Sequence, residues 1–180
     1  EDLNAQITKV NFALWPRLFH HMDPETSPPE THVPGLLYLE IETIVSELLT
    51  RHHLHTKDSL MHTLLFDAKY QTLTKQHFDS IPGAFSESQG WGTFHFWGLD
   101  ANGKRVGLQL KDGSLQSADG SFRVAFTPEA VAEGLQKKTL MPAMSLCYVM
   151  IAFHYGLACL GGFCQIHDLT LFKRAYEQIL

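Results

Sequence analysis

Three pairs of turn-forming residues within residues 91–126 constrain the fold of this chain more than any other feature of its sequence. The pairs are Asn102-Gly103, Asp112-Gly113 and Asp119-Gly120. Asparagine, aspartate and glycine tolerate the positive φ that two-residue hairpin turns require. The pattern therefore predicts a four-stranded antiparallel meander. Its strands are expected near 92–101, 104–111, 114–118 and 121–126.

The three turns also predict which residues of neighbouring strands face each other. The expected pairs are Trp97–Leu108, Leu99–Val106, Leu110–Leu115, Leu115–Val124 and Ser117–Phe122. In this register one face of the sheet collects apolar side chains together with His95, and the other face is polar. Phe94 and Phe96 fall on the polar face, where they are either covered by another element or form a contact patch.

Helical periodicity on both sides of the meander predicts an α+β fold, with helices packing on the apolar face of the sheet. Before the meander, helices are expected in 2–22, with a kink or break at Pro16, in 36–54, and again after Thr56 or Asp58. After it, Thr127 is expected to cap a helix, a second helix spans 142–160, and Asp168 or Thr170 caps the last one.

The length of 180 residues suits a single α+β domain over 1–180. Residues 24–34 are rich in proline, which predicts an arm or connection without regular structure. Two roles are open to this arm. It extends over the surface, or it reaches a second copy of the chain and supports a homo-oligomer.

Charge and cysteine content narrow the partners and the compartment. The net charge is −5, and adjacent basic residues occur only as three scattered pairs, so nucleic acid is not expected as a partner. The three cysteines cannot pair completely, which favours the reducing cytoplasm. The chain begins at Glu1, so the sequence leaves open whether a targeting peptide has been removed.

Residues 141–164 contain no Asp, Glu, Lys or Arg, and the stretch is long enough to cross a membrane. His154 near its centre and Gly156 argue against a span, because an ionisable ring is costly in lipid. A buried core helix is therefore preferred to a membrane span.

Two histidines are the leading candidates for catalysis. His154 lies within the apolar stretch, and His95 points to the apolar face of the sheet in the register above. Either both are core histidines with hydrogen-bond partners, or they are acid–base groups of a pocket. His154 is expected to be buried and uncharged, with a partner such as His95, Gln165 or Asp168. The other candidate ligand contacts are Trp97, Cys147, Met150, Gln165 and Asp168.

A histidine-rich segment offers a weaker hypothesis of metal binding. His52 and His55 are three residues apart, a spacing that can share a metal, and His62 is a candidate third ligand. The alternative is a solvated helix end, where such side chains favour the exposed carbonyl groups.

No motif in the sequence identifies a cofactor or a reaction. The leading hypothesis is a small-molecule enzyme or ligand-binding protein with a pocket between the sheet and the 142–160 helix. The alternative is a protein-interaction or oligomerisation module without catalysis, in which the proline-rich arm and Phe94 and Phe96 contact a partner. Histidine-mediated metal binding is the third possibility.

Overall fold

The computed structural model of the protein describes residues 3–19, 39–158 and 163–180. The chain divides into two units, Glu1–Glu40 and Ile41–Leu180, and each is described by itself. The first unit contains helix α1 (Leu3–Phe19), which runs through Pro16 without a break, so the loss of one backbone donor does not end this helix. The predicted arm at 24–34 lies outside the described residues.

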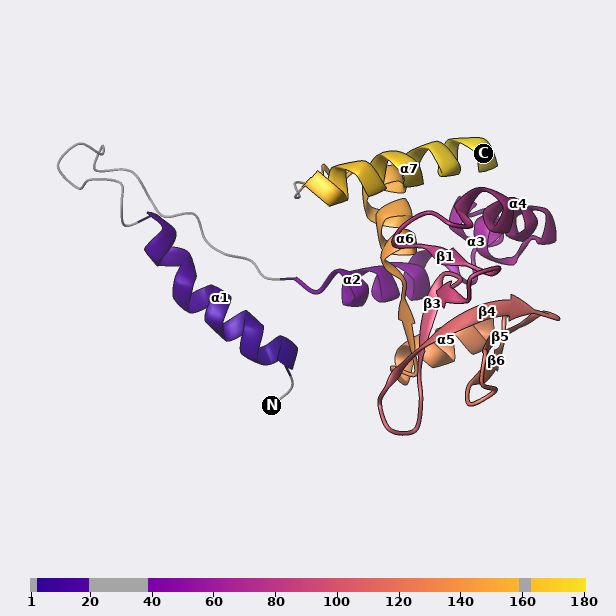
Figure 1. The fold of residues 1–180 in the computed structure, drawn as a ribbon, viewed down its shortest axis with the longest axis horizontal. Helices are drawn as coiled ribbons and strands as arrows, with labels where there is room; N and C mark the ends of the chain where they lie inside the picture. Colours follow the sequence, from indigo (N-terminus) through magenta and orange to yellow (C-terminus); the bar gives the residue numbers. More distant parts are fainter. Residues whose placement is uncertain (1–2, 20–38, 159–162) are drawn as a thin grey trace. The chain divides into compact units, whose positions relative to one another are not determined.

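The second unit is built around a five-stranded antiparallel sheet in the order β6-β5-β4-β3-β7, with helices packing on it (Figure 1). The α+β fold class is therefore confirmed. A separate two-stranded hairpin precedes the sheet. The strands are β1 (Phe85–Ser86), β2 (Trp91–Gly92), β3 (Phe96–Leu99), β4 (Arg105–Lys111), β5 (Ser114–Ser117), β6 (Arg123–Ala125) and β7 (Leu140–Pro142).

The second and third hairpins of the meander have the predicted register. Leu115 pairs with Leu110 on one side and with Val124 on the other. Asp112 and Gly113 have φ values of 48° and 68°, as a two-residue turn of the mirror-image type requires. Turn chemistry read from the sequence therefore placed these strands correctly.

The predicted register of the first hairpin is wrong by one residue. A longer loop, closed by the side chain of Asp100, replaces the expected two-residue turn. The Asp100 carboxylate accepts hydrogen bonds from the backbone N–H groups of Asn102 and Lys104 at 2.9 and 2.8 Å. As a result, Trp97 pairs with Gly107 instead of facing Leu108.

A shift of one residue exchanges the two faces of a strand, and this happens on β3. Phe94 and Phe96 are 1% and 0% exposed and belong to the core, so of the two alternatives these phenylalanines are covered and do not form a contact patch. Trp97 is half-buried instead, and the Arg105 guanidinium lies 4.3 Å from its ring centre in a cation–π contact.

The apolar stretch does not form the predicted helix over 142–160. Its first residues form β7, which pairs with β3 and makes β3 an inner strand. The following helix α6 (Met144–Tyr148) continues as a π-helical turn, η2 (Val149–His154), and Gly156 follows with a φ of 73°. Residues 141–154 are thus divided among β7, α6 and η2. Within the described ranges, no helix is both long and apolar enough for a membrane crossing.

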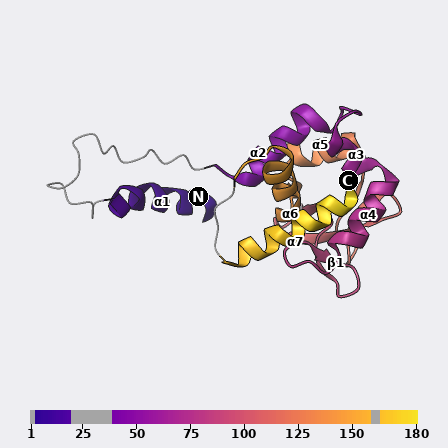
Figure 2. The same ribbon diagram turned by 90° about the horizontal axis from the view of Figure 1, so that it is seen from above.

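The remaining helices enclose the core of the second unit (Figures 1 and 2). They are α2 (Ile41–Leu48), which continues as the π-helical turn η1 (Leu49–His53), then α3 (Leu60–Phe66), α4 (Ala68–Phe78), α5 (Pro128–Gln136) and α7 (Phe163–Ile179). Thr127 caps α5 as predicted, accepting a hydrogen bond from the Ala130 N–H. α7 begins at Phe163, so Asp168 and Thr170 lie inside it and do not cap it.

One core joins the helices to the sheet. The Phe78 and Phe172 rings stack at 5.9 Å between α4 and α7, and the Phe66 and Phe126 rings meet at 5.3 Å between α3 and the segment after β6. The same buried cluster contains two leucines of the sheet and four residues of the helices, which are Leu108, Leu115, Val45, Leu49, Leu64 and Leu65. The core therefore fixes α2 and η1 against the rest of the second unit.

Gly107 on β4 lies close to the backbone of β2, and this contact gives the first testable prediction. A Cβ atom at this position would lie 2.4 Å from the Gly92 carbonyl oxygen, so one of the two backbones would have to move. We expect Gly107→Ala to lower the free energy of unfolding by about 1–3 kcal/mol, as overpacking of a rigid contact does. Urea denaturation measures the change.

The control for this prediction is Gln109→Ala, two residues further along the same strand and half-buried. Its expected cost is below about 1 kcal/mol, because it removes a polar side chain without a new clash. Equal costs for the two variants would contradict the close approach of β2 and β4.

Candidate functional site

The two histidines predicted to share a pocket lie in different surroundings. His95 is 6% exposed, and its ring packs 4.5 Å from that of Phe94. Its Nε2 atom is buried without a hydrogen-bond partner among the described residues. Burial lowers the pKa of His95 from 6.5 to about 4, so this ring is neutral at pH 7.

His154 is not buried in the core, contrary to the prediction. It is half-buried at the end of η2, because the helical segment ends here rather than near residue 160. Its ring lies 5.3 Å from that of His53 and 4.9 Å from that of Tyr155. Asp168, an expected partner, is half-buried on α7, and the side chain of Gln165 lies outside the described residues.

Two other predicted ligand contacts, Cys147 and Met150, are fully buried. Burial, with a smaller effect of the Glu42 charge, raises the pKa of the Cys147 thiol to about 12. A thiol with this pKa is not the nucleophile of a reaction near neutral pH. Both side chains belong to the core cluster, and their role as ligand contacts stays a prediction.

The histidine at the centre of the site is His53, which was not among the predicted site residues. It is 6% exposed and ends η1, just as His154 ends η2. Turns of π-helix are rare and often occur at functional sites. The turns η1 and η2 bring the imidazole rings of His53 and His154 into edge contact.

Two hydroxyl groups hold the ring of His53. The Nδ1 atom lies 2.6 Å from Ser59 Oγ, and the Nε2 atom lies 2.8 Å from Tyr155 Oη. Burial, followed by the neighbouring imidazoles of His154 and His52, lowers the pKa of His53 below its ordinary value of 6.5. The ring is therefore neutral at pH 7, with one nitrogen donating a hydrogen bond and the other accepting one.

A sequence signal for His53 exists in the spacing of apolar residues. Ile41, Val45 and Leu49 follow one another at intervals of four, and His53 is the next member of the series. Val45 and Leu49 are completely buried. A histidine that continues a buried helical face is a candidate site residue, whereas the prediction followed the spacing of His52 and His55.

The candidate metal ligands are not arranged around a common point. His52 and His55 are exposed, and the Nδ1–H of His62 donates a 2.7 Å hydrogen bond to the Leu54 carbonyl. In the part of the chain that the structure describes, no three His, Cys, Asp or Glu side chains form a group that could hold a metal ion. The hypothesis of metal binding gains no support from this geometry.

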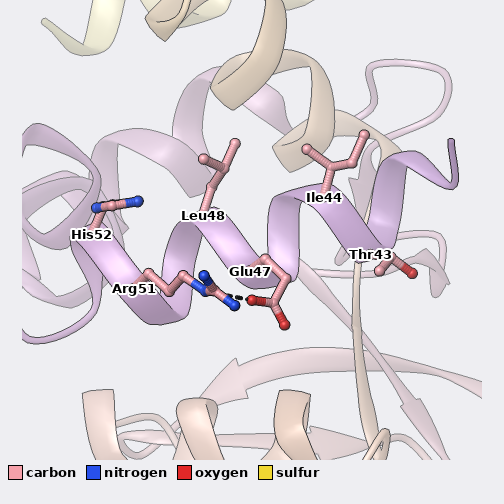
Figure 3. A pocket seen from close by; sticks show the side chains of 6 residues that line it. All are labelled: Thr43, Ile44, Glu47, Leu48, Arg51 and His52. Atoms are coloured by element: carbon pink, nitrogen blue, oxygen red, sulfur yellow. Dashed lines mark hydrogen bonds and ion pairs between the residues drawn. The ribbon is translucent and has the colours of Figure 1, made fainter.

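A groove of about 460 Å³ runs along α2 and ends at His52 (Figure 3). Ile44 and Leu48 point to one side of the helix, and Glu47 and Arg51 form an exposed ion pair of 2.6 Å on the other. The ring of His52 lies 6.4 Å from that of His53. The residues that line this depression thus come from an apolar side and a charged side of one helix, next to His52.

Comparison with known proteins provides no relative from which a function could be transferred. No protein-family model matches the chain, and no curated protein or solved structure is significantly similar to it. The chemistry of the His53 site is therefore the basis for a functional assignment.

Proposed function

We propose that this chain is a small-molecule enzyme or ligand-binding protein, with His53 as the polar centre of its site. The observation that carries the proposal is the arrangement around this ring. A buried neutral imidazole is hydrogen-bonded at both nitrogens, by hydroxyls that lie 6 and 102 residues away in the sequence. Perturbed histidines with defined partners are frequent at functional sites.

In this proposal the site lies at His53, whereas the sequence predicted a pocket between the sheet and the 142–160 helix. His53 acts as a general acid or base, since a neutral imidazole accepts a proton near physiological pH. The groove along α2 receives the ligand, with Leu48 and Ile44 as its apolar wall. We further propose a cytoplasmic location, because Cys147 is a free thiol and the number of cysteines is odd.

Binding of small aromatic fragments, followed by NMR of the histidine rings, tests the proposal. We expect neutral and anionic aromatic fragments with Kd values of about 1 mM to shift the signals of His52 and His53. Thr43→Trp fills the groove from an exposed position, and we expect it to abolish these shifts.

The matched control is Thr72→Trp, which places the same side chain at an exposed position on α4. This variant should bind the fragments as the natural chain does. If no fragment shifts the His52 and His53 signals, or if Thr43→Trp binds as well as Thr72→Trp, the α2 groove is not the ligand site.

A further inference from the structure

Ser59 occupies the N-cap position of α3, yet its side chain does not cap this helix. Serine is favoured at N-caps because its oxygen accepts a hydrogen bond from a backbone N–H of the first turn. In α3 the N-cap side chain makes no such bond. Ser59 Oγ lies 2.6 Å from His53 Nδ1 instead, so the hydroxyl is directed at the imidazole.

The other side of the imidazole is held by Tyr155, which fixes the ring in place. When Ser59 O–H donates to Nδ1, the neutral ring carries its proton on Nε2, and Nε2–H donates to Tyr155 Oη at 2.8 Å. This is the arrangement of an activated nucleophile. A hydroxyl lies within hydrogen-bond distance of a base, and a third group orients the base.

The site is also open to solvent at one side. Tyr155 is 48% exposed and Ser59 is half-buried, whereas the imidazole between them is buried. The lone pairs of Ser59 Oγ are free to attack when its proton is shared with Nδ1. A small electrophile is therefore the kind of molecule that fits this geometry.

We infer that Ser59 is a nucleophile that forms an acyl intermediate with small carboxylic esters, with His53 as its general base. This inference rests on the proposed function and names the substrate class of the same site. The orienting group is a neutral phenol, which stabilises an imidazolium less than a carboxylate does. Esters with good leaving groups, such as aryl esters, are therefore the substrates that suit it.

The reaction balances with water as the only co-reactant. Ser59 Oγ attacks the carbonyl carbon while Nδ1 takes the hydroxyl proton. The C–O bond to the leaving group then breaks, and the departing oxygen takes that proton from Nδ1. Water next attacks the acyl–serine and gives one proton to Nδ1. The carboxylic acid leaves, and Ser59 Oγ regains its proton.

A fluorophosphonate probe tests the nucleophile on the folded chain of 180 residues. The Ser59 oxygen forms a bond to phosphorus, the P–F bond breaks, and fluoride leaves with the proton passing through His53 to solvent. Intact mass spectrometry and peptide mapping are expected to show one adduct per chain, located on Ser59. Heat-denatured protein should not be labelled, because the serine needs the folded arrangement.

Variants identify the contribution of each group. Ser59→Ala should lose the adduct, and Ser46→Ala, at a half-buried serine that donates to the Glu42 carbonyl, should retain it. His53→Gln is expected to slow labelling by about 100-fold, the usual contribution of a general base. Tyr155→Phe keeps the imidazole and should also slow labelling, which covers the case that His53→Gln fails to fold.

Three results would overturn the inference. They are an adduct on Tyr155 instead of Ser59, no adduct on the folded chain, and equal labelling rates for Tyr155→Phe and the natural chain. Fragment binding in the α2 groove without an adduct on Ser59 would leave the proposed function in place and remove the nucleophile. If no fragment binds in the α2 groove and no adduct forms on Ser59, both the proposed function and the nucleophile are wrong.

Discussion

Lowering the pH from 6.5 to about 4 is expected to reduce the free energy of unfolding by about 3 kcal/mol through His95 alone. Burial lowers the pKa of this ring from 6.5 to about 4 in the folded protein. Each unit of pKa difference between the folded and unfolded states corresponds to about 1.4 kcal/mol.

The sign follows from proton uptake. Between pH 6.5 and 4 the unfolded chain binds a proton at His95 and the folded chain does not, so acid favours unfolding. The contribution of His95 to the free energy of unfolding is complete above pH 6.5. It is lost as the pH falls through the pKa of about 4 that this ring has in the folded protein. His53 contributes with the same sign, because burial and the nearby imidazoles lower its pKa too.

His95→Phe isolates the effect of the first ring. Phenylalanine has a similar shape, is suited to the contact with Phe94, and removes a buried Nε2 that has no partner among the described residues. His95 has a φ of 60°, a left-handed conformation that phenylalanine adopts less readily than histidine, and this cost opposes the gain from removing an unsatisfied buried atom. We therefore expect the free energy of unfolding of the variant at pH 7 to lie within about 1 kcal/mol of that of the natural chain. Between pH 7 and 4.5, the free energy of unfolding should fall less in His95→Phe than in the natural chain.

Urea denaturation at a series of pH values measures this difference, and the comparison cancels the titration of the carboxylates. The control is His55→Phe, which makes the same substitution at an exposed position. If His95→Phe and the natural chain lose the same free energy on acidification, His95 is not buried as the structure places it.

The sequence predicted those parts of the fold that local turn chemistry determines. Asp112-Gly113 occupies positions with positive φ, and the hairpin around it has the predicted register. The first hairpin differs because the Asp100 side chain closes a longer loop. The pair Asn102-Gly103 does not by itself reveal that the Asp100 carboxylate accepts hydrogen bonds from the backbone of this loop.

Strand β7 illustrates what a local pattern cannot predict. Its residues Leu140–Pro142 lie at the start of an apolar stretch for which one helix was predicted, and they become a strand by pairing with β3, about forty positions earlier. Such pairing depends on which edge of the sheet is free, not on the residues within the strand itself. Pro142, which lacks a backbone donor, fits the edge of the sheet.

The candidate site was predicted less well than the fold for a similar reason. The series Ile41, Val45, Leu49 and His53 marks a buried helical face, so His53 was accessible to sequence reasoning. Its contact with Tyr155 spans 102 residues and depends on where η2 ends, which no spacing along the chain reveals.

Replacement of His53 by alanine is expected to lower the free energy of unfolding by about 2–4 kcal/mol, because it removes a buried ring and two hydrogen bonds. The ring is 6% exposed and bonds Ser59 and Tyr155. His52→Ala, at the exposed neighbouring position, should change stability by less than about 0.5 kcal/mol. Urea denaturation at pH 7 compares the two variants.

A double-mutant cycle then separates the hydrogen bond from the packing of the ring. Tyr155→Phe alone should cost about 1 kcal/mol, because it removes only the hydroxyl that bonds His53 Nε2. In a chain that already carries His53→Ala, the same substitution should cost close to nothing, which gives a coupling energy of about 0.5–1.5 kcal/mol. Strict additivity of the two substitutions would show that η1 and η2 are not joined through this bond. The neutral imidazole would then lack the group that orients it, and both the acid–base role of His53 and the activation of Ser59 would lose their geometric basis.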